Sequence, residues 1–283
     1  IERVLSADDM QGRKTFTPGI DKAADFIASE FEKNKLQFFG NAKNYFQDFT
    51  MFKVKPLQVT GLLDNATLNT ENVVVNSTSA GQQISNLKDY EIVTIKKEDN
   101  FNKLAQSYFQ SSKNLIVLID TSFSKAFKRL QWFTTREKFE MPVTQVFILT
   151  VNTNPTSIQL EIKNEVTKQD LKNVVAVLPG KSKKDEYVVF GGHYDHLGIG
   201  RPDKNMHSIY NGANDDAAGT TAVMMLANYF SKLKNNERTL IFVAFTAEEV
   251  GGFGSRFFSK QLPPEKVVAM FNIEMIGTES KWG

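Results

Sequence analysis

The sequence contains no cysteine, which excludes disulfide bonds and thiolate chemistry. This absence leaves the cellular compartment open, because exported proteins can also lack cysteine. No apolar run reaches the roughly 18 residues that a membrane-spanning helix needs, so no membrane span is predicted. Excess charge is lacking too: the formal net charge is +2, and the densest basic cluster consists of Lys181, Lys183 and Lys184. Because a polyanion would need a larger basic patch, nucleic acid is not expected as a partner.

What the chain has is the composition of a globular protein, with 41% hydrophobic and 23% charged residues over 283 positions. This length suits one large domain or two ordinary ones. Internal repeats and low-complexity tracts are absent from the sequence. The sequence begins at Ile1 without a methionine, so the lack of a signal peptide does not decide whether the protein is exported.

Three regions of the chain differ in their apolar pattern. Residues 20–34 place apolar side chains at helical spacing, which predicts an amphipathic surface helix. Residues 55–168 contain short apolar runs separated by polar loops, which favours a self-contained β-rich domain. After Lys172, continuous apolar strands alternate with helical stretches, a pattern typical of a mostly parallel sheet with helices on both faces. We therefore predict a doubly wound α/β domain formed by residues 1–54 and 169–283, with the β-rich region inserted as an accessory domain.

Ionisable side chains follow the predicted strands of the last region. Glu248 and Glu249 come directly after the apolar run "TLIFVAFTA". The full set at strand or helix ends is His193, Asp195, Asp215, Glu248, Glu249 and Glu274. In mostly parallel sheets, ligands bind at the carboxyl ends of the strands, so we expect these side chains to lie close together.

A histidine and several carboxylates at one edge of a sheet concentrate negative charge, which is costly to bury unless a cation is present. A metal ion would supply that cation. Histidine and carboxylate donors without a thiolate suit zinc, manganese or cobalt in a hydrolytic centre better than a closed structural zinc site. If one of Glu248 and Glu249 binds the metal, its neighbour can act as a general base toward water.

Each residue taken alone also has an ordinary structural explanation. His193 would more often be a hydrogen-bonded structural histidine, and Asp215 is a plausible helix N-cap. The paired glutamates fit a solvated loop, and Asp195 with His196 fits an ordinary surface pair. Glu274 is harder to explain in this way, because a glutamate within the strand-like "MFNIEMIG" needs a partner. The joint occurrence at several strand and helix ends favours a site.

Four segments, in this order, resemble the signature motifs of the M28 family of zinc metallopeptidases: "GGHYDHLG", "NGANDDAAG", "FTAEEVGGFGSRFF" and "NIEMIG". The segment "LSADDMQGRKTFTPGIDKAADFIASEF" resembles the opening segment of the bacterial secreted members. The resemblance covers roughly residues 3–50 and 172–283. It implies a zinc-exopeptidase-like fold, an aminopeptidase-like activity on peptide substrates and an extracytoplasmic location, periplasmic or secreted.

The resemblance also implies a role for each site residue. Glu248 becomes the general base, and Asp195 would hold the second ring nitrogen of the histidine that binds the metal. A complete site would contain two zinc ions, which polarise the substrate carbonyl and activate water. The metal ligands implied are His193 and Glu274 on one ion, Glu249 on the other, and Asp215 as a bridge between both.

Three departures from the family pattern modify these expectations. Glu274 stands where most members have aspartate, and Asp216 follows the bridging residue where asparagine is common. The family also places a histidine ligand well downstream of the last carboxylate, whereas this sequence has no histidine after His207. We therefore expect the chain to be truncated at its C-terminal end. Such a chain would bind one zinc ion or none, and it could be inactive. His207 itself is a less favoured substitute for the missing ligand.

Two further functions stay open at this point. A glutaminyl cyclase-like enzyme fits a site that lacks one ligand, because relatives catalyse glutaminyl cyclisation with a single zinc ion. A non-catalytic binding protein on the same fold belongs to a different class. The intact set of ionisable residues argues against it, because a decayed site usually loses ligands.

Overall fold

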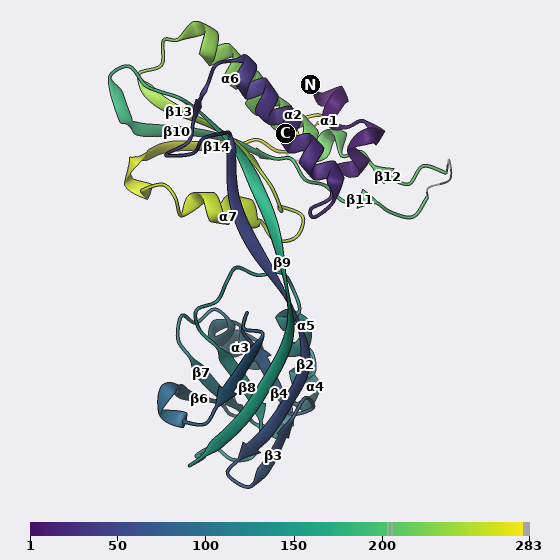
Figure 1. Ribbon diagram of the computed structural model, residues 1–283, viewed down its shortest axis with the longest axis vertical. Coiled ribbons are helices and arrows are strands. Elements are labelled where there is room, and N and C mark those ends of the chain that lie inside the picture. The colour runs from purple at the N-terminus through teal and green to yellow at the C-terminus, as the bar shows by residue number, and fades with distance from the viewer. Residues whose placement is uncertain (203, 205, 280–283) are drawn as a thin grey trace. The chain divides into compact units, whose positions relative to one another are not determined.

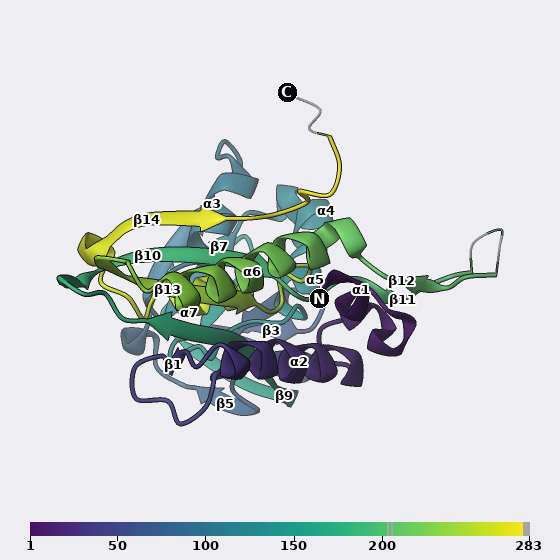
Figure 2. The same ribbon diagram turned by 90° about the horizontal axis from the view of Figure 1, so that it is seen from above.

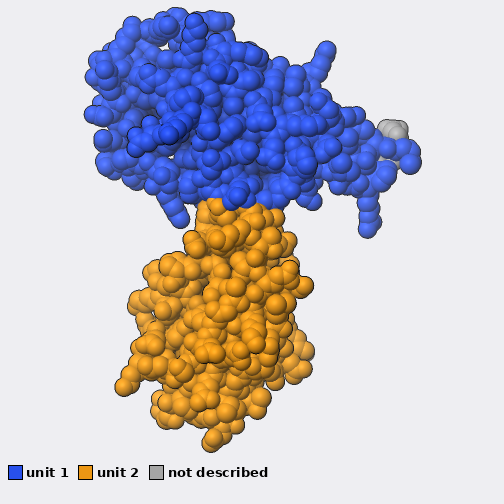
Figure 3. All heavy atoms as spheres, viewed as in Figure 1, with its two compact units in different colours: residues 1–49, 170–283 blue, residues 50–169 orange. Residues whose placement is uncertain are grey.

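The computed structural model describes residues 1–202, 204 and 206–279. It contains two compact units (Figure 3): the first unit is residues 1–49 with 170–283, and the second unit is residues 50–169. The chain passes between the units twice, within strand β2 (Phe46–Leu63) and within strand β9 (Ile158–Leu178). All six candidate site residues belong to the first unit.

The first unit is built on a sheet with the strand order β14–β10–β13–β9 (Figure 1). Strand β10 pairs in parallel with β13 and with β14, whereas β9 pairs antiparallel with β13. The α/β class with a mostly parallel sheet is therefore confirmed, with β9 as an antiparallel strand beside the parallel ones. A short strand, β1 (Gln37–Phe38), also pairs with β9. The other strands are β10 (Lys183–His193), β13 (Arg238–Phe245) and β14 (Val267–Asn272).

Helices cover both faces of this sheet, which explains the continuous apolar runs in its strands. The helix predicted over residues 20–34 is α2 (Pro18–Lys33), and it packs beside α6 (Ala218–Leu233) on one face (Figures 1 and 2). Helix α7 (Phe253–Ser259) packs on the other face. The side chains of β13 alternate between the two faces, with Phe242 and Ala244 toward α2 and α6, and Ile241, Val243 and Phe245 toward α7.

The second unit contains helices as well as strands. One sheet has the order β4–β8–β7–β6, in which β6, β7 and β8 are parallel and β4 pairs antiparallel with β8. A core cluster joins this sheet to β2, β3, β5 and β9. The strands are β3 (Ala66–Asn69), β4 (Val73–Asn76), β5 (Gly81–Ile84), β6 (Glu91–Ile95), β7 (Leu115–Ile119) and β8 (Gln145–Leu149). The helices are α3 (Phe101–Phe109), α4 (Ser124–Phe127) and α5 (Leu130–Thr134).

The N-terminal segment is fastened to the first unit by the buried side chain of Arg13. Its guanidinium donates hydrogen bonds to the carbonyl oxygens of Tyr194 (2.8 Å), Asn211 (2.7 Å), Gly212 (2.9 Å) and Leu5. Burial lowers the pKa of Arg13 to about 10, so the side chain stays charged at neutral pH. Because Tyr194 follows β10 and Gly212 lies shortly before α6, one side chain holds both segments. The short elements around it are α1 (Glu2–Leu5), β11 (Gly198–Ile199) and β12 (Ile209–Tyr210).

We expect Gly219→Ala, at the start of α6, to destabilise the first unit. A Cβ atom at Gly219 would lie 2.0 Å from the carbonyl oxygen of Ile273 and 2.5 Å from Oδ1 of Asp216. The start of α6 and the segment after β14 would therefore have to move apart. Such overpacking costs about 1–3 kcal/mol, which outweighs the ~1 kcal/mol by which alanine favours a helix over glycine.

Thermal unfolding followed by circular dichroism measures this loss as a lower melting temperature. Gly81→Ala serves as the control, because the nearest atom to a Cβ atom at Gly81 is 3.7 Å away. Equal melting temperatures for the Gly219 variant and the unmodified chain would contradict the close contact.

Candidate metal centre

The carboxyl ends of β10, β13 and β14 meet at one edge of the first-unit sheet. His193, the last residue of β10, pairs in register with Phe245 at the end of β13, and Asn272 at the end of β14 pairs with Gly191. The paired glutamates and Glu274 follow these ends within a few residues. Parallel strands therefore bring side chains that are far apart in the sequence to the same edge, as the strand directions require.

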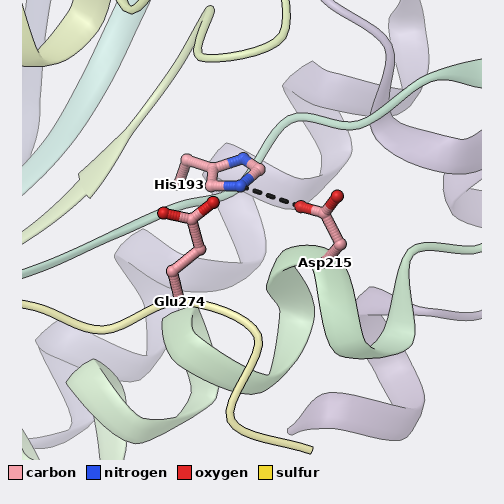
Figure 4. A group of neighbouring side chains, drawn as sticks. All are labelled: His193, Asp215 and Glu274. Atoms are coloured by element: carbon pink, nitrogen blue, oxygen red, sulfur yellow. Dashed lines mark ion pairs between the residues drawn. The ribbon is translucent and has the colours of Figure 1, made fainter. Parts of the chain in front are cut away.

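The first group of donor atoms consists of His193, Asp215 and Glu274 (Figure 4). One donor atom from each residue lies within 4.8 Å of the others, and both carboxylates point toward the imidazole ring. Nε2 of His193 lies 3.0 Å from Oδ1 of Asp215. Among the described residues this buried nitrogen has no hydrogen-bond partner, because the contact lacks hydrogen-bond geometry. A buried ring nitrogen of this kind is a candidate metal ligand.

The second group consists of His196, Asp215 and Glu249. Nδ1 of His196 lies 2.8 Å from Oε1 of Glu249 and 3.9 Å from Oδ2 of Asp215. His196 is only 9% exposed. The sequence alone offered an ordinary surface pair as one explanation for Asp195 and His196, whereas both residues are buried. The position of His196 three residues after His193, in a sequence with three histidines, was the available signal.

Asp195 is completely buried and its carboxylate accepts hydrogen bonds mainly from other parts of the site. Oδ1 accepts from the backbone N–H of Glu248 (3.0 Å), and Oδ2 accepts from the backbone N–H of Glu249 (3.2 Å) and from the hydroxyl of Thr15 (3.0 Å). Nδ1 of His193 lies 3.1 Å from the backbone carbonyl oxygen of Asp195 and 3.7 Å from its carboxylate. The carboxylate therefore positions the paired glutamates, while the backbone carbonyl oxygen is the closer contact of the His193 ring.

Asp216, which the sequence marks only as a departure from the family pattern, is also completely buried. Its carboxylate accepts hydrogen bonds from the backbone N–H groups of His193 (3.1 Å), Gly219 (3.0 Å) and Met275 (3.1 Å). These groups belong to the end of β10, the start of α6 and the residue after Glu274. One side chain thus connects the three segments that carry the first donor group. Burial raises the pKa of Asp216 to about 6, although these three hydrogen bonds act in the opposite direction.

The charges at this edge perturb one another. Burial alone would lower the pKa of His193, but the carboxylates of Asp195, Asp216 and Glu248 outweigh it and raise this pKa to about 9. Partial burial also raises the pKa of Glu248, and the negative charges of its neighbours add to this effect. The raised pKa of His193 reports a concentration of negative charge that attracts cations.

These residues fit a zinc site. Zinc in proteins binds imidazole nitrogen and carboxylate oxygen at about 2.0–2.1 Å in tetrahedral geometry, which separates neighbouring ligand atoms by about 3.3 Å. The nitrogen–oxygen separations of 2.8, 3.0 and 3.9 Å lie around this value. His193, Asp215, Glu249 and Glu274, the four ligands that the sequence predicts, are all members of the two donor groups. Their role as ligands stays a prediction.

Comparison with known proteins finds a family match for the part of the chain that carries this geometry. Residues 173–282 match the model of peptidase family M28, and this segment contains all six candidate site residues. A probable zinc metalloprotease of Pyrenophora teres f. teres is 34% identical over 110 residues, which are 38% of this chain and 23% of that protein. A vacuolar membrane protease of Schizosaccharomyces pombe is 27% identical over 161 residues, 56% of this chain and 18% of that protein. The matched parts therefore span less than a quarter of either relative.

Among solved structures, the chain is similar to a zinc aminopeptidase from Bacillus subtilis. The TM-score is 0.47 at 18% sequence identity, with 98% of this chain and 68% of that chain covered. An aminopeptidase from Aneurinibacillus sp. strain AM-1 has a TM-score of 0.46 at 18% identity, over 99% of this chain and 73% of that chain.

We expect zinc to bind more tightly as the pH rises from about 6 to about 8. The pKa of His193 is raised to about 9 in the metal-free chain, so a zinc ion has to displace a proton from this ring throughout that range. Because binding displaces one proton, the apparent Kd for zinc should fall about tenfold for each unit by which the pH rises. Isothermal titration calorimetry in two buffers with different ionisation enthalpies measures the affinity and counts the protons released.

His207→Gln is the matched control, because His207 is exposed and pairs with Asp8 outside both donor groups. This variant should keep the full pH dependence of zinc binding. His193→Gln should release one proton fewer when zinc binds, because the variant lacks this ring. An affinity for zinc that is constant between these pH values would contradict the involvement of His193.

Proposed function

We propose that this chain, whose residues 173–282 match peptidase family M28, is a zinc-dependent peptidase that removes N-terminal residues from peptides. The observation that carries the proposal is the convergence, inside the matched segment, of two imidazoles and three carboxylates at the carboxyl edge of the sheet. His193, Asp215 and Glu274 would hold one zinc ion, and Asp215 and Glu249 would contribute to holding a second. When bound, zinc polarises the substrate carbonyl and makes water a stronger nucleophile at neutral pH.

Glu248 is the residue we assign to proton transfer. In the reaction, water adds to the carbonyl carbon of the peptide bond and the C–N bond breaks. Glu248 accepts one proton from the attacking water and delivers it to the leaving amine nitrogen. Its raised pKa supports both steps, because a carboxylate with a pKa closer to neutrality is a better base and its acid form persists longer.

The surrounding residues would position this base. The carboxylate of Asp195 holds the backbone N–H groups of both glutamates, so Glu248 and its neighbour Glu249 keep a fixed relation to each other. His193 is held from both sides, by the Asp195 carbonyl oxygen at its ring and by Asp216 at its backbone. Preorganisation of this kind keeps a base and metal ligands in reactive geometry without an ordering cost during the reaction.

Two donor groups among the described residues support a two-ion hydrolase over a glutaminyl cyclase-like enzyme with one zinc ion. They also oppose a non-catalytic binding protein, because the ionisable residues of both groups are in place. The choice of N-terminal residues as the cleavage site rests on the motif resemblance. It is supported by the negative charge at the edge, which would attract the α-ammonium group of a peptide.

The location of the protein stays a prediction. The resemblance to bacterial secreted peptidases implies an extracytoplasmic location. A similar protein from Schizosaccharomyces pombe is described as a vacuolar membrane protease. None of the helices in the described part of the chain is long and apolar enough to cross a membrane.

We expect Glu248→Gln to lower kcat by about two orders of magnitude or more while the zinc content stays the same, since the amide cannot accept the proton from water. Peptide hydrolysis is measured together with zinc by elemental analysis. Glu265→Gln, at an exposed glutamate just before the start of β14, is the matched control and should leave turnover unchanged, because the site lies beyond the other end of this strand.

Pairs of peptides with a free or an acetylated N-terminus test the cleavage site in the same assay. An aminopeptidase should cleave the free peptide and spare the acetylated one. Unchanged turnover in Glu248→Gln would remove Glu248 from the base role, and a zinc-loaded chain that hydrolyses no peptide would contradict the proposed function.

A further inference from the structure

We propose that the second unit binds the surface of an anionic lipid bilayer through the outward face of helices α4 and α5. The inference is independent of the proposed function, because this face lies in the second unit and the candidate metal centre lies in the first. The face, which we call the basic–aromatic face, consists of the exposed side chains of Lys125, Lys128, Arg129, Trp132, Phe133 and Arg136.

Helical spacing separates this face from the core of the second unit. Lys128 and Arg129, which connect α4 to α5, keep right-handed helical backbone angles, so one helical spacing runs through both helices. The buried positions of the segment are Phe127, Leu130 and Thr134. The exposed positions that follow one another at intervals of four, three and four residues are Lys125, Arg129, Trp132 and Arg136. At about 100° per residue these two sets point in opposite directions, so the helices pack on the core with one side and present the other outward.

The basic–aromatic face carries charge of one sign. Between Asp120 and Glu137 the sequence has four basic residues and no acidic residue. Glu137, at the end of the segment, is already paired with Lys53 (3.1 Å). Within the described part of the chain, none of the four basic side chains forms an ion pair with a carboxylate. Their charges are therefore available to an anionic partner.

Two large aromatic rings lie among these charges. Trp132 is 60% exposed and Phe133 is 48% exposed. Their ring centroids are 5.1 Å apart in an edge-to-face arrangement, and the guanidinium of Arg136 lies 4.9 Å from the centroid of the Trp132 ring. A chain gains free energy by burying such rings, so their outward position beside polar groups indicates a surface that a partner covers.

A lipid surface accommodates both properties of the face. Lysine and arginine reach the phosphate groups with their charged ends, while aromatic rings lie at the boundary between headgroups and acyl chains. Tryptophan suits this boundary because one end of its ring system is apolar and the other is polar. An acidic protein segment would use the charges, but it would offer no apolar layer to Trp132 and Phe133. The combination of basic side chains and outward rings therefore favours an anionic bilayer.

The other side of the sheet β4–β8–β7–β6 provides matched control positions. Val117 of β7 faces the core cluster that contains residues of α4 and α5, whereas Leu118 faces the cluster that joins the sheet to β5 and β9. Leu87 packs against this second cluster, so its exposed neighbour Lys88 lies on the side away from the basic–aromatic face. The exposed Lys163 of β9 lies on that side as well.

Sedimentation of the full chain with lipid vesicles measures the binding. We expect the chain to bind vesicles that contain phosphatidylglycerol, to bind pure phosphatidylcholine vesicles much more weakly, and to dissociate as the salt concentration rises. The double variant Lys125→Gln/Arg129→Gln should lower the partition coefficient roughly 25-fold, since each basic residue near an anionic surface contributes about fivefold. Lys88→Gln/Lys163→Gln changes the net charge equally and should bind like the unmodified chain.

The fluorescence of Trp132 tests whether the aromatic rings enter the lipid. The sequence contains Trp132 and Trp282, so Trp282→Phe leaves Trp132 as the single tryptophan. Its emission should shift to shorter wavelength on phosphatidylglycerol vesicles and should be quenched by phospholipids with brominated acyl chains. Trp132→Ala/Phe133→Ala keeps all four charges and should weaken partitioning about tenfold or more. Both rings are exposed, so circular dichroism should show an unchanged fold.

Each remaining outcome would overturn the proposal. These outcomes are no binding to vesicles, equal loss of binding in the control variant, and binding without a shift in Trp132 emission. Binding of poly-glutamate in place of vesicles would assign the face to an acidic protein segment. Zinc content and peptide hydrolysis, measured without vesicles, should be the same in all these variants. A failure of the proposed function would leave the vesicle results unaffected.

Discussion

Two fully buried aspartates, Asp195 and Asp216, hold the candidate site together through hydrogen bonds to the backbone. An ionised carboxylate without water is costly, and backbone N–H donors are the means by which the fold offsets that cost. Asp216 accepts from the segments after β10 and β14 and from the start of α6. Asp195 accepts from both glutamates after β13. Every segment that carries a candidate ligand is thereby fixed to one of these two side chains or lies directly beside one.

This arrangement separates two kinds of carboxylate by environment. Asp195 and Asp216 face inward to the backbone, whereas Glu248 and Glu274 remain exposed at the edge of the sheet. The inner pair makes the edge more negative and raises the pKa of His193, and the outer set offers oxygens to a cation. A rigid inner layer and an accessible outer layer are what a hydrolytic metal centre requires, since ligand positions have to persist while substrates exchange.

The order of strands and helices in the first unit could be predicted because the local spacing of apolar residues indicates each element. The same pattern placed His193, Glu249 and Glu274 at strand ends, and the parallel direction of the strands then brought them to one edge. The roles of His196, Asp216 and Arg13 could not be predicted in this way. Each depends on hydrogen bonds or contacts between segments remote in the sequence, such as the one from Arg13 to the Tyr194 carbonyl oxygen across 181 positions. In the second unit, the short apolar runs indicated strands, but their parallel pairing with intervening helices is a long-range property that short runs do not contain.

The division of the first unit into two stretches of sequence has a consequence for the order of folding during synthesis. The second unit is complete once residue 169 has left the ribosome, because it is continuous in the chain. Arg13, by contrast, reaches its acceptor at Gly212 only 199 positions later, and β10 gains its neighbour β14 later still. The inserted unit can therefore reach its native fold first. At that point the apolar face of helix α2 is not yet covered, because most of its sheet has not been synthesised. Nascent chains therefore expose that face until the residues that cover it, from Val174 to Ala244, have been synthesised.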